Sequence, residues 1–150
     1  MLALVFRVGQ ERYALPCQQL IEVVPLVTLR PIAHAPDYVA GMFVLRGEVV
    51  PVVDLCRLML GTVCPDRLSS RIMLARLGTH ILGILAEQVT EAVDLVRQAS
   101  AISVPAAPYL GDLFLDQRDP NAGAAGTMVQ LLEVGKLLPQ ELQQRLLGGG

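Results

Sequence analysis

Short apolar segments that meet at glycine-containing turns recur along the chain. Residues 2–8 and 12–16 flank Gly9, and residues 71–77 and 80–86 flank Gly78. Two further pairs are residues 41–46 with 48–55, around Gly47, and residues 112–116 with 127–134, around a longer insert. Apolar runs of this length between turn residues predict strands joined as hairpins, buried on both faces. We therefore predict an all-β fold.

Three prolines and Gly41 indicate where the strands are expected to be irregular or to give way to short helical turns. Pro51 cannot donate a ladder hydrogen bond, so we expect an edge strand or a bulge there. A short helical turn is expected directly after Pro16. A second is expected in residues 36–41, with Pro36 at its first position and Gly41 near its end.

The clearest helix signal lies at the C-terminus, in residues 137–147. Pro139 marks its start, and the three glycines from Gly148 mark its end. Three leucines share one helical face, so we expect this face to dock on the sheets. They are Leu138, Leu142 and Leu146.

The two halves of the sequence resemble each other. Residues 6–24 align with residues 75–93, and residues 49–59 align with residues 128–138 at a larger offset. The difference in offset matches an insert at residues 117–127, which we predict to be a solvated loop because it is rich in Gly, Ala, Asp and Pro. We infer an internal duplication within one domain. It predicts two lobes, roughly residues 1–68 and 69–150, on a shared hydrophobic seam.

Composition excludes several classes of protein. Hydrophobic residues make up 53% of the chain and charged residues only 17%, which excludes intrinsic disorder. This apolar surplus favours a strand-rich core or exposed apolar patches that meet a partner. The net charge of -2 and the scattered basic residues predict no nucleic-acid partner.

No apolar run approaches the roughly 18 to 20 residues that a membrane-spanning helix needs. The apolar start of the chain ends at Arg7, with no basic region before it and no cleavage site. We therefore predict a cytoplasmic protein that does not insert into the membrane. Its three cysteines, Cys17, Cys56 and Cys64, are then expected to be reduced thiols.

Residues suited to catalysis or metal binding are few. His34 and His80 are far apart, and neither has metal-ligand spacing to another histidine or to a cysteine. Phosphate-loop and nucleophile-elbow motifs are absent from the sequence. Cys17 and Cys56 lie in apolar segments, where a buried structural cysteine is the common case. We predict no catalytic residue, no metal and no cofactor.

The order of motifs in the first half resembles the CheW family of chemotaxis coupling proteins. The family pattern is a strand pair ending in Ala-Leu-Pro, a valine-rich Glu-Val-x-Pro segment, and a Tyr-Val-x-Gly segment before Leu-Arg-Gly-x-Val-Val-Pro-Val-Val-Asp-Leu. The matching segments here are residues 13–16, 22–25, 36–41 and 45–55. Val44 replaces the usual Asn, and Ala86-Glu87 replaces Val-Asp. The second half matches more loosely.

The resemblance implies two SH3-like five-stranded β-barrel lobes with short helices, and no enzyme activity. Such adaptors bridge the cytoplasmic tip of a chemoreceptor to the regulatory domain of a CheA-type histidine kinase. By this resemblance the protein is recruited to membrane-bound receptor arrays.

The dipeptide Arg46-Gly47 is the main candidate site. A tight turn between two apolar runs needs a residue that tolerates positive φ, which Gly47 supplies. Arg46 is then either a solvated turn residue or an arginine held by a carboxylate at a partner groove. The resemblance points to Glu22 as that carboxylate, and Glu48 is the local alternative. The predicted partner-binding residues are Leu20, Glu22, Val23, Arg46, Gly47, Gly83 and Val89.

A second class of function stays open, a small-ligand-binding or enzymatic β-barrel that uses Cys56 or His80. The two classes differ in one geometric expectation. An adaptor places Arg46 and Glu22 on an open surface, whereas a ligand-binding barrel places them at the mouth of a deep pocket.

Overall fold

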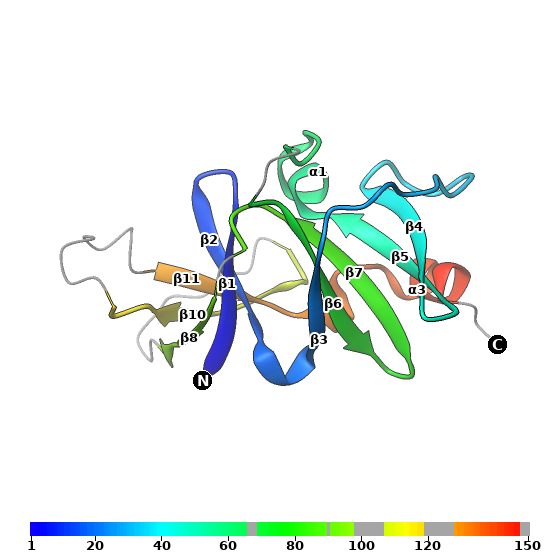
Figure 1. Cartoon of the computed structure of the whole chain (residues 1–150). Helices are drawn as coiled ribbons and strands as arrows, with labels where there is room; N and C mark the ends of the chain where they lie inside the picture. Colours follow the sequence, from blue (N-terminus) through cyan, green and yellow to red (C-terminus); the bar gives the residue numbers. More distant parts are fainter. Residues whose placement is uncertain (66–68, 90, 98–106, 119–127, 148–150) are drawn as a thin grey trace.

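The computed structural model describes residues 1–65, 69–89, 91–97, 107–118 and 128–147. Two β-sheets pack as two lobes, with the N-terminus beside one sheet and the C-terminal helix beside the other (Figure 1). This confirms the predicted all-β class with two lobes and short helices. None of the helices in the described part of the chain combines the length and hydropathy that crossing a membrane requires.

Sheet A has six strands and sheet B has five, among the residues that the structure describes. Sheet A has the order β8 (Ala92–Asp94), β1 (Leu2–Val8), β2 (Glu11–Pro16), β11 (Met128–Leu132), β10 (Leu110–Leu115) and β9 (Val96–Arg97). Sheet B has the order β3 (Leu20–Pro25), β6 (Arg71–Leu77), β7 (His80–Ala86), β5 (Glu48–Asp54) and β4 (Val39–Leu45). The short strand β9 makes sheet A larger than the five strands expected. Closure of either sheet into a barrel stays a prediction.

Each sheet takes strands from both halves of the sequence. The hairpin β1–β2 joins β8, β10 and β11 in sheet A, whereas the hairpin β6–β7 joins β3, β4 and β5 in sheet B. A boundary near residue 68 therefore does not separate the two sheets. The crossing is visible in Figure 1, where the chain leaves sheet A after β2 and returns to it after β7.

The ladder registers of the two sheets correspond. Ala3 pairs with Val93 in sheet A, and the residues aligned with them, Ile72 and Val24, pair in sheet B. Leu131 pairs in parallel with Ala14, and the aligned Val52 pairs in parallel with Gly83. This correspondence favours the duplication, which stays a proposal, with the two hairpins exchanged between the halves.

One hydrophobic core is shared by the two sheets. Alternate residues of β1 point to opposite faces of sheet A: Leu4, Phe6 and Val8 enter the shared core, and Ala3 and Val5 enter a smaller second cluster. The shared core also holds residues of sheet B, such as Ile72, Leu74 and Ile84. The predicted hydrophobic seam therefore lies between the two sheets, and β1 is buried on both faces as expected.

The helical segments agree only in part with expectation. A 3-10 helix, η1 (Cys17–Gln19), follows Pro16 as predicted. The C-terminal helix α3 (Gln140–Leu146) begins after Pro139 and docks as expected, with Leu138 and Leu142 buried. The helix expected in residues 36–41 is wrong. A turn closes there by a hydrogen bond from Val39 N to Pro36 O, and β4 follows at once.

The edge or bulge expected at Pro51 is also wrong. β5 lies between β7 and β4, and the irregularity of the β4–β5 ladder falls between Val39 and Gly41. Pro51 is tolerated because Met42, its partner on β4, needs no hydrogen bond from it. The backbone N–H and carbonyl of Met42 both bond to Arg30, away from β5. On the other side the pairing with β7 begins only at Val52, so no ladder bond requires a Pro51 N–H.

A network of charges on sheet A surrounds one buried carboxylate. Asp116, after β10, is 4% exposed and accepts 2.6 Å and 2.9 Å bonds from Arg12 of β2 and from Arg118. Arg118 also binds Glu91 at 2.7 Å. Arg118 is thus tied to the sheet, although the predicted loop began at Gln117. Residues 119–127 of that loop lie outside the described residues.

We expect Asp116 to make stability depend on acid. Hydrogen bonds from Arg118 and Arg12 outweigh the effect of burial and hold the pKa of Asp116 well below its usual range. A carboxyl whose pKa is lower in the folded state than in the unfolded state stabilises the fold at pH values above its unfolded-state pKa of about 3.9. This contribution is lost progressively as the pH falls below that value. Asp116→Asn should therefore be less stable at neutral pH and lose less on acidification. Denaturant unfolding at pH 7 and pH 3 measures this. Asp112→Asn, in the exposed pair with Arg97, is the control and should change the profile little.

Candidate functional site

The β4–β5 turn places Arg46 and Gly47 as its two central residues. Leu45 and Glu48 close the ladder on either side, and φ is 48° at Arg46 and 82° at Gly47. Two positive φ values are what a two-residue type I′ hairpin requires, so the expected role of Gly47 is confirmed. Arg46 takes the same left-handed region, which disfavours a residue with a Cβ. The backbone strain at Arg46 marks this turn as a candidate for function.

Arg46 reaches across to the other edge of sheet B. Its Nη1 donates to Glu22 Oε1 at 2.7 Å, so the carboxylate that the resemblance pointed to is the partner, not Glu48. Glu22 lies on edge strand β3, directly after a register shift between Leu20 and Glu22. The β4–β5 turn belongs to the opposite edge of the sheet. The ion pair therefore brings the two edges of sheet B together.

Exposed valines lie close in sequence to both members of this ion pair. Val23 follows Glu22 and is 41% exposed. Val44 and Val49 face each other across the β4–β5 ladder beside the turn and are 67% and 57% exposed. We name Glu22, Val23, Val44, Arg46 and Val49 the edge surface. Val23 points to the opposite face of β3 from Glu22, so these residues form a sheet edge and not one flat patch. Exposed apolar side chains and a fixed charge pair at one edge are typical of a protein-recognition surface.

Two of the seven predicted site residues lie elsewhere. Gly83 is buried in the middle of β7, where an added Cβ would lie 2.9 Å from Val52 Cγ2, so it serves close packing of strands and not a surface. Val89 is 9% exposed, and its backbone N–H donates to Ser69 O, just before the start of β6. Leu20 pairs with β6 near its other end, so the two residues lie apart. Val89 aligns with Leu20 in the repeat, and the exchange of hairpins between the sheets separates them. Leu20 is half-buried beside the edge surface.

The edge surface is open. Arg46 is 72% exposed and Glu22 is 32% exposed. The larger of the two cavities described, about 490 Å³, is lined by Tyr38, Tyr109 and residues 135–140, and it includes neither member of the pair. His80 lies in the smaller cavity, of about 270 Å³, beside α3. This geometry agrees with the expectation for an adaptor.

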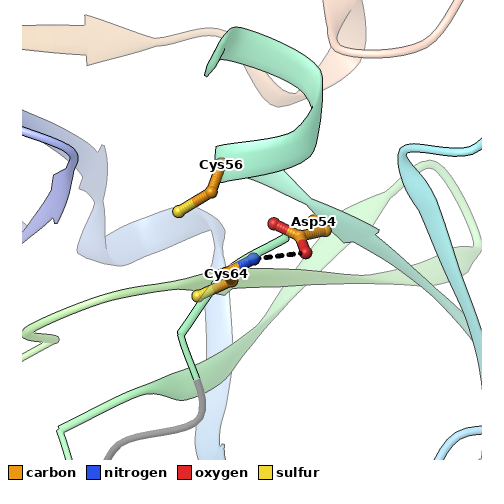
Figure 2. Close-up of side chains that lie close together, drawn as sticks. All are labelled: Asp54, Cys56 and Cys64. Atoms are coloured by element: carbon orange, nitrogen blue, oxygen red, sulfur yellow. Dashed lines mark hydrogen bonds between the residues drawn. The ribbon is translucent and has the colours of Figure 1, made fainter. Parts of the chain in front are cut away.

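Sequence reasoning missed a polar cluster at the start of the six-residue helix α1 (Leu55–Leu60). Asp54 caps this helix by accepting from Arg57 N at 3.1 Å, and its other oxygen accepts from Cys64 N at 2.9 Å. Cys56 and Cys64 lie beside it (Figure 2). The hydrogen bond between the two thiols raises the pKa of Cys56, and burial raises it further. The same hydrogen bond lowers the pKa of Cys64, although burial acts in the opposite direction. A thiol that is 1% exposed and has a raised pKa is a poor nucleophile, which disfavours an enzymatic role for Cys56.

Comparison with known proteins places the chain in a family. The sequence profile of the CheW-like domain matches residues 2–142. The chemotaxis protein CheW of Helicobacter pylori is 32% identical over 67% of this chain, and the match spans 60% of that protein's length. Protein FrzA of Myxococcus xanthus is 28% identical over 93% of this chain and 86% of its own length.

A solved structure supports the fold. The scaffolding protein TtCheW of Thermoanaerobacter tengcongensis superposes with a TM-score of 0.73 at 20% identity, covering 92% of this chain and 87% of that protein. At this identity the likeness concerns the fold, and the profile match carries the assignment. Because that match runs over nearly the whole chain, the protein belongs to the CheW-like domain family.

Proposed function

We propose that this protein is a non-enzymatic adaptor of a chemotaxis-like pathway, which couples the cytoplasmic tip of a chemoreceptor to the regulatory domain of a CheA-type histidine kinase. Family membership and the names of its relatives, a chemotaxis protein and a scaffolding protein, support this function. The protein would then work in the cytoplasm, recruited to membrane-bound receptor arrays.

The edge surface is the observation that carries the proposal. It combines a 2.7 Å ion pair with three exposed valines on the edges of one sheet. Such valines contribute binding energy when a partner covers them, since each buried apolar Å² is worth about 25 cal/mol. A partner that covers the surface would also desolvate the ion pair, whose fixed geometry then contributes specificity.

Folding alone explains the pair poorly. An ion pair with one partner 72% exposed contributes about 0 to 1 kcal/mol to stability. Arg46 also takes a left-handed φ that glycine or asparagine adopts more easily. A residue that stabilises so little, in a conformation unfavourable for it, is better explained by recognition. The buried Cys56 and the position of His80 in a small cavity away from the edge surface make an enzyme the weaker alternative.

Arg46→Ala should therefore separate stability from signalling. Alanine keeps the Cβ and hence the backbone strain, so the melting temperature should change by no more than a few degrees. Binding to the kinase regulatory domain or to the receptor should weaken by about tenfold or more, because the partner would bury Glu22 without its arginine. Thermal unfolding beside a pull-down and a reconstituted kinase assay, with kinase and receptor from the same source, measures both.

The chain offers a matched control in the pair Arg97–Asp112, which is also 2.7 Å long and exposed but lies in sheet A. Arg97→Ala should leave binding and kinase control unchanged. Glu22→Ala should act like Arg46→Ala, and the double variant should be less than additive because the residues share one interaction. Full activity of a stable Arg46→Ala protein would contradict the proposal, and severe destabilisation would return Arg46 to a structural role.

A further inference from the structure

Three potential metal ligands converge beside α1, in a region the edge surface does not include. One carboxylate oxygen of Asp54 and the Sγ atoms of Cys56 and Cys64 all lie within 4.8 Å of one another. All three residues are buried, at 4%, 1% and 5% exposure. Figure 2 shows Cys56 on α1, Cys64 on the segment below it and the Asp54 carboxylate beside them, with the two sulfur atoms on the side away from the Asp54 backbone.

A fourth donor lies next to this group. Cys56 Sγ donates to Glu87 Oε2 at 3.7 Å, and Glu87 directly follows β7. We propose that Asp54, Cys56, Cys64 and Glu87 form a binding site for a thiophilic divalent cation of the zinc class. Two sulfur and two oxygen donors suit zinc, because thiolates exclude magnesium and calcium from such a site.

The spacing is near what a tetrahedral site requires. Bonds of about 2.3 Å to sulfur and about 2.0 Å to oxygen place tetrahedral ligand atoms about 3.5 to 3.8 Å apart. The ligand atoms of Asp54, Cys56 and Cys64 lie within 4.8 Å of one another, which is at most about one ångström more than this spacing. Rotation of the thiols about χ1 to another staggered position is the motion that would close this difference.

The Asp54 carboxylate is already held in place. One oxygen accepts from Arg57 N and the other from Cys64 N, so each keeps a lone pair for a metal ion. Hydrogen bonds of this kind orient a ligand and are the usual surroundings of a metal-binding carboxylate. The same bond fixes the backbone of Cys64 next to Asp54.

Charge favours the same conclusion. Two buried or half-buried carboxylates beside two thiols make a site of negative potential, which a divalent cation neutralises. The cation replaces the two thiol protons, so binding forms two metal–sulfur bonds and releases two protons to the buffer.

The bound ion would connect elements that the sequence keeps apart. It joins α1 and the segment at Cys64 to Glu87, whose backbone pairs with Arg7 of β1 in sheet A. α1 itself contacts β1, β5 and β7. A metal ion here would stabilise the junction of the two sheets.

The test uses the full chain, reduced and stripped of metal by a chelator. Titration with cobalt(II) should give one equivalent bound, with the thiolate-to-cobalt absorption band and the visible bands of a tetrahedral site. Zinc should displace the cobalt, raise the melting temperature and release protons, measured in weakly buffered solution. Absence of the thiolate band in the wild-type protein overturns the proposal, whatever the variants do.

Three variants locate the site. Cys56→Ser and Cys64→Ser should each weaken zinc binding on the order of 100-fold, because the binding free energy is shared among four ligands. Cys17→Ser removes the remaining cysteine and should bind as the wild type does. Binding that survives both Cys56→Ser and Cys64→Ser would be adventitious, for example at His34 or His80, and would overturn the site. So would a Cys56–Cys64 disulfide in the oxidised protein with no metal bound after reduction.

Discussion

Gly41→Ala is expected to destabilise the protein by about 3 kcal/mol. Gly41 has φ of 145°, in a region that residues with a Cβ avoid, and a Cβ there would lie 2.6 Å from the Arg30 carbonyl oxygen and 2.9 Å from Leu29 Cβ. Backbone strain and overpacking each cost about 1 to 3 kcal/mol. The clash falls on backbone, next to the paired hydrogen bonds between Arg30 and Met42, so it is not relieved by turning a side chain. Urea unfolding measures the loss.

Gly78→Ala is the matched control for this prediction. Gly78 also has positive φ, at 63°, but an added Cβ there would meet nothing within 4 Å. We expect a loss of about 1 kcal/mol, from backbone strain alone. Equal losses in the two variants would show that the close approach of residues 29–30 to β4 contributes nothing to stability.

Leu142→Ala is expected to cost about 3 kcal/mol, since removing a buried leucine leaves a cavity. Leu142 is 7% exposed and joins the core that both sheets share, with Leu137 and Leu138 just before the helix. Loss of its side chain should loosen α3 and lower the melting temperature. Thermal and denaturant unfolding, with helical circular dichroism as a second readout, measure the effect.

Gln144→Ala tests the exposed face of the same helix. Gln144 is exposed, and alanine is at least as good a helix former, so stability should change by no more than about 0.5 kcal/mol. If Leu142→Ala left the melting temperature unchanged and weakened partner binding instead, the leucine face of α3 would be an interaction site and not part of the core.

The local pattern of the sequence determined the strands of the hairpins, but not every element. Residues 2–8, 71–77 and 80–86 were predicted as strands and are strands over those residues. Glycine turns and apolar runs are read from a few neighbouring residues, so they do not depend on the rest of the fold. The ion pair of Arg46 with Glu22 followed from the family resemblance, because 24 residues separate the two and no local rule joins them.

Some local signals were present and missed. Asp54 before an apolar stretch and Gly61 after it are the N-cap and C′ residues of α1, and Gly61 has the left-handed φ of 78° typical of a helix end. The continuous run into β5 hid this helix, because an apolar strand and a short buried helix look alike in sequence. The Tyr-Val-Ala-Gly segment was predicted as helix but leads into a strand. Gly41 allows two backbones to approach closely there and does not end a helix.

Only the tertiary structure decided which segments meet. It exchanged the hairpins β1–β2 and β6–β7 between the two sheets, which put Gly83 in the interior and Val89 far from Leu20. It also brought Cys56 and Cys64 beside Asp54, and Glu87 beside Cys56, although their spacing matches no metal-ligand motif. Apolar periodicity indicates that a strand is buried, but it does not indicate which other strand or sheet the strand packs against. That choice is made by long-range packing of whole sheets, whose energy is spread over many side chains and appears in no short stretch of sequence.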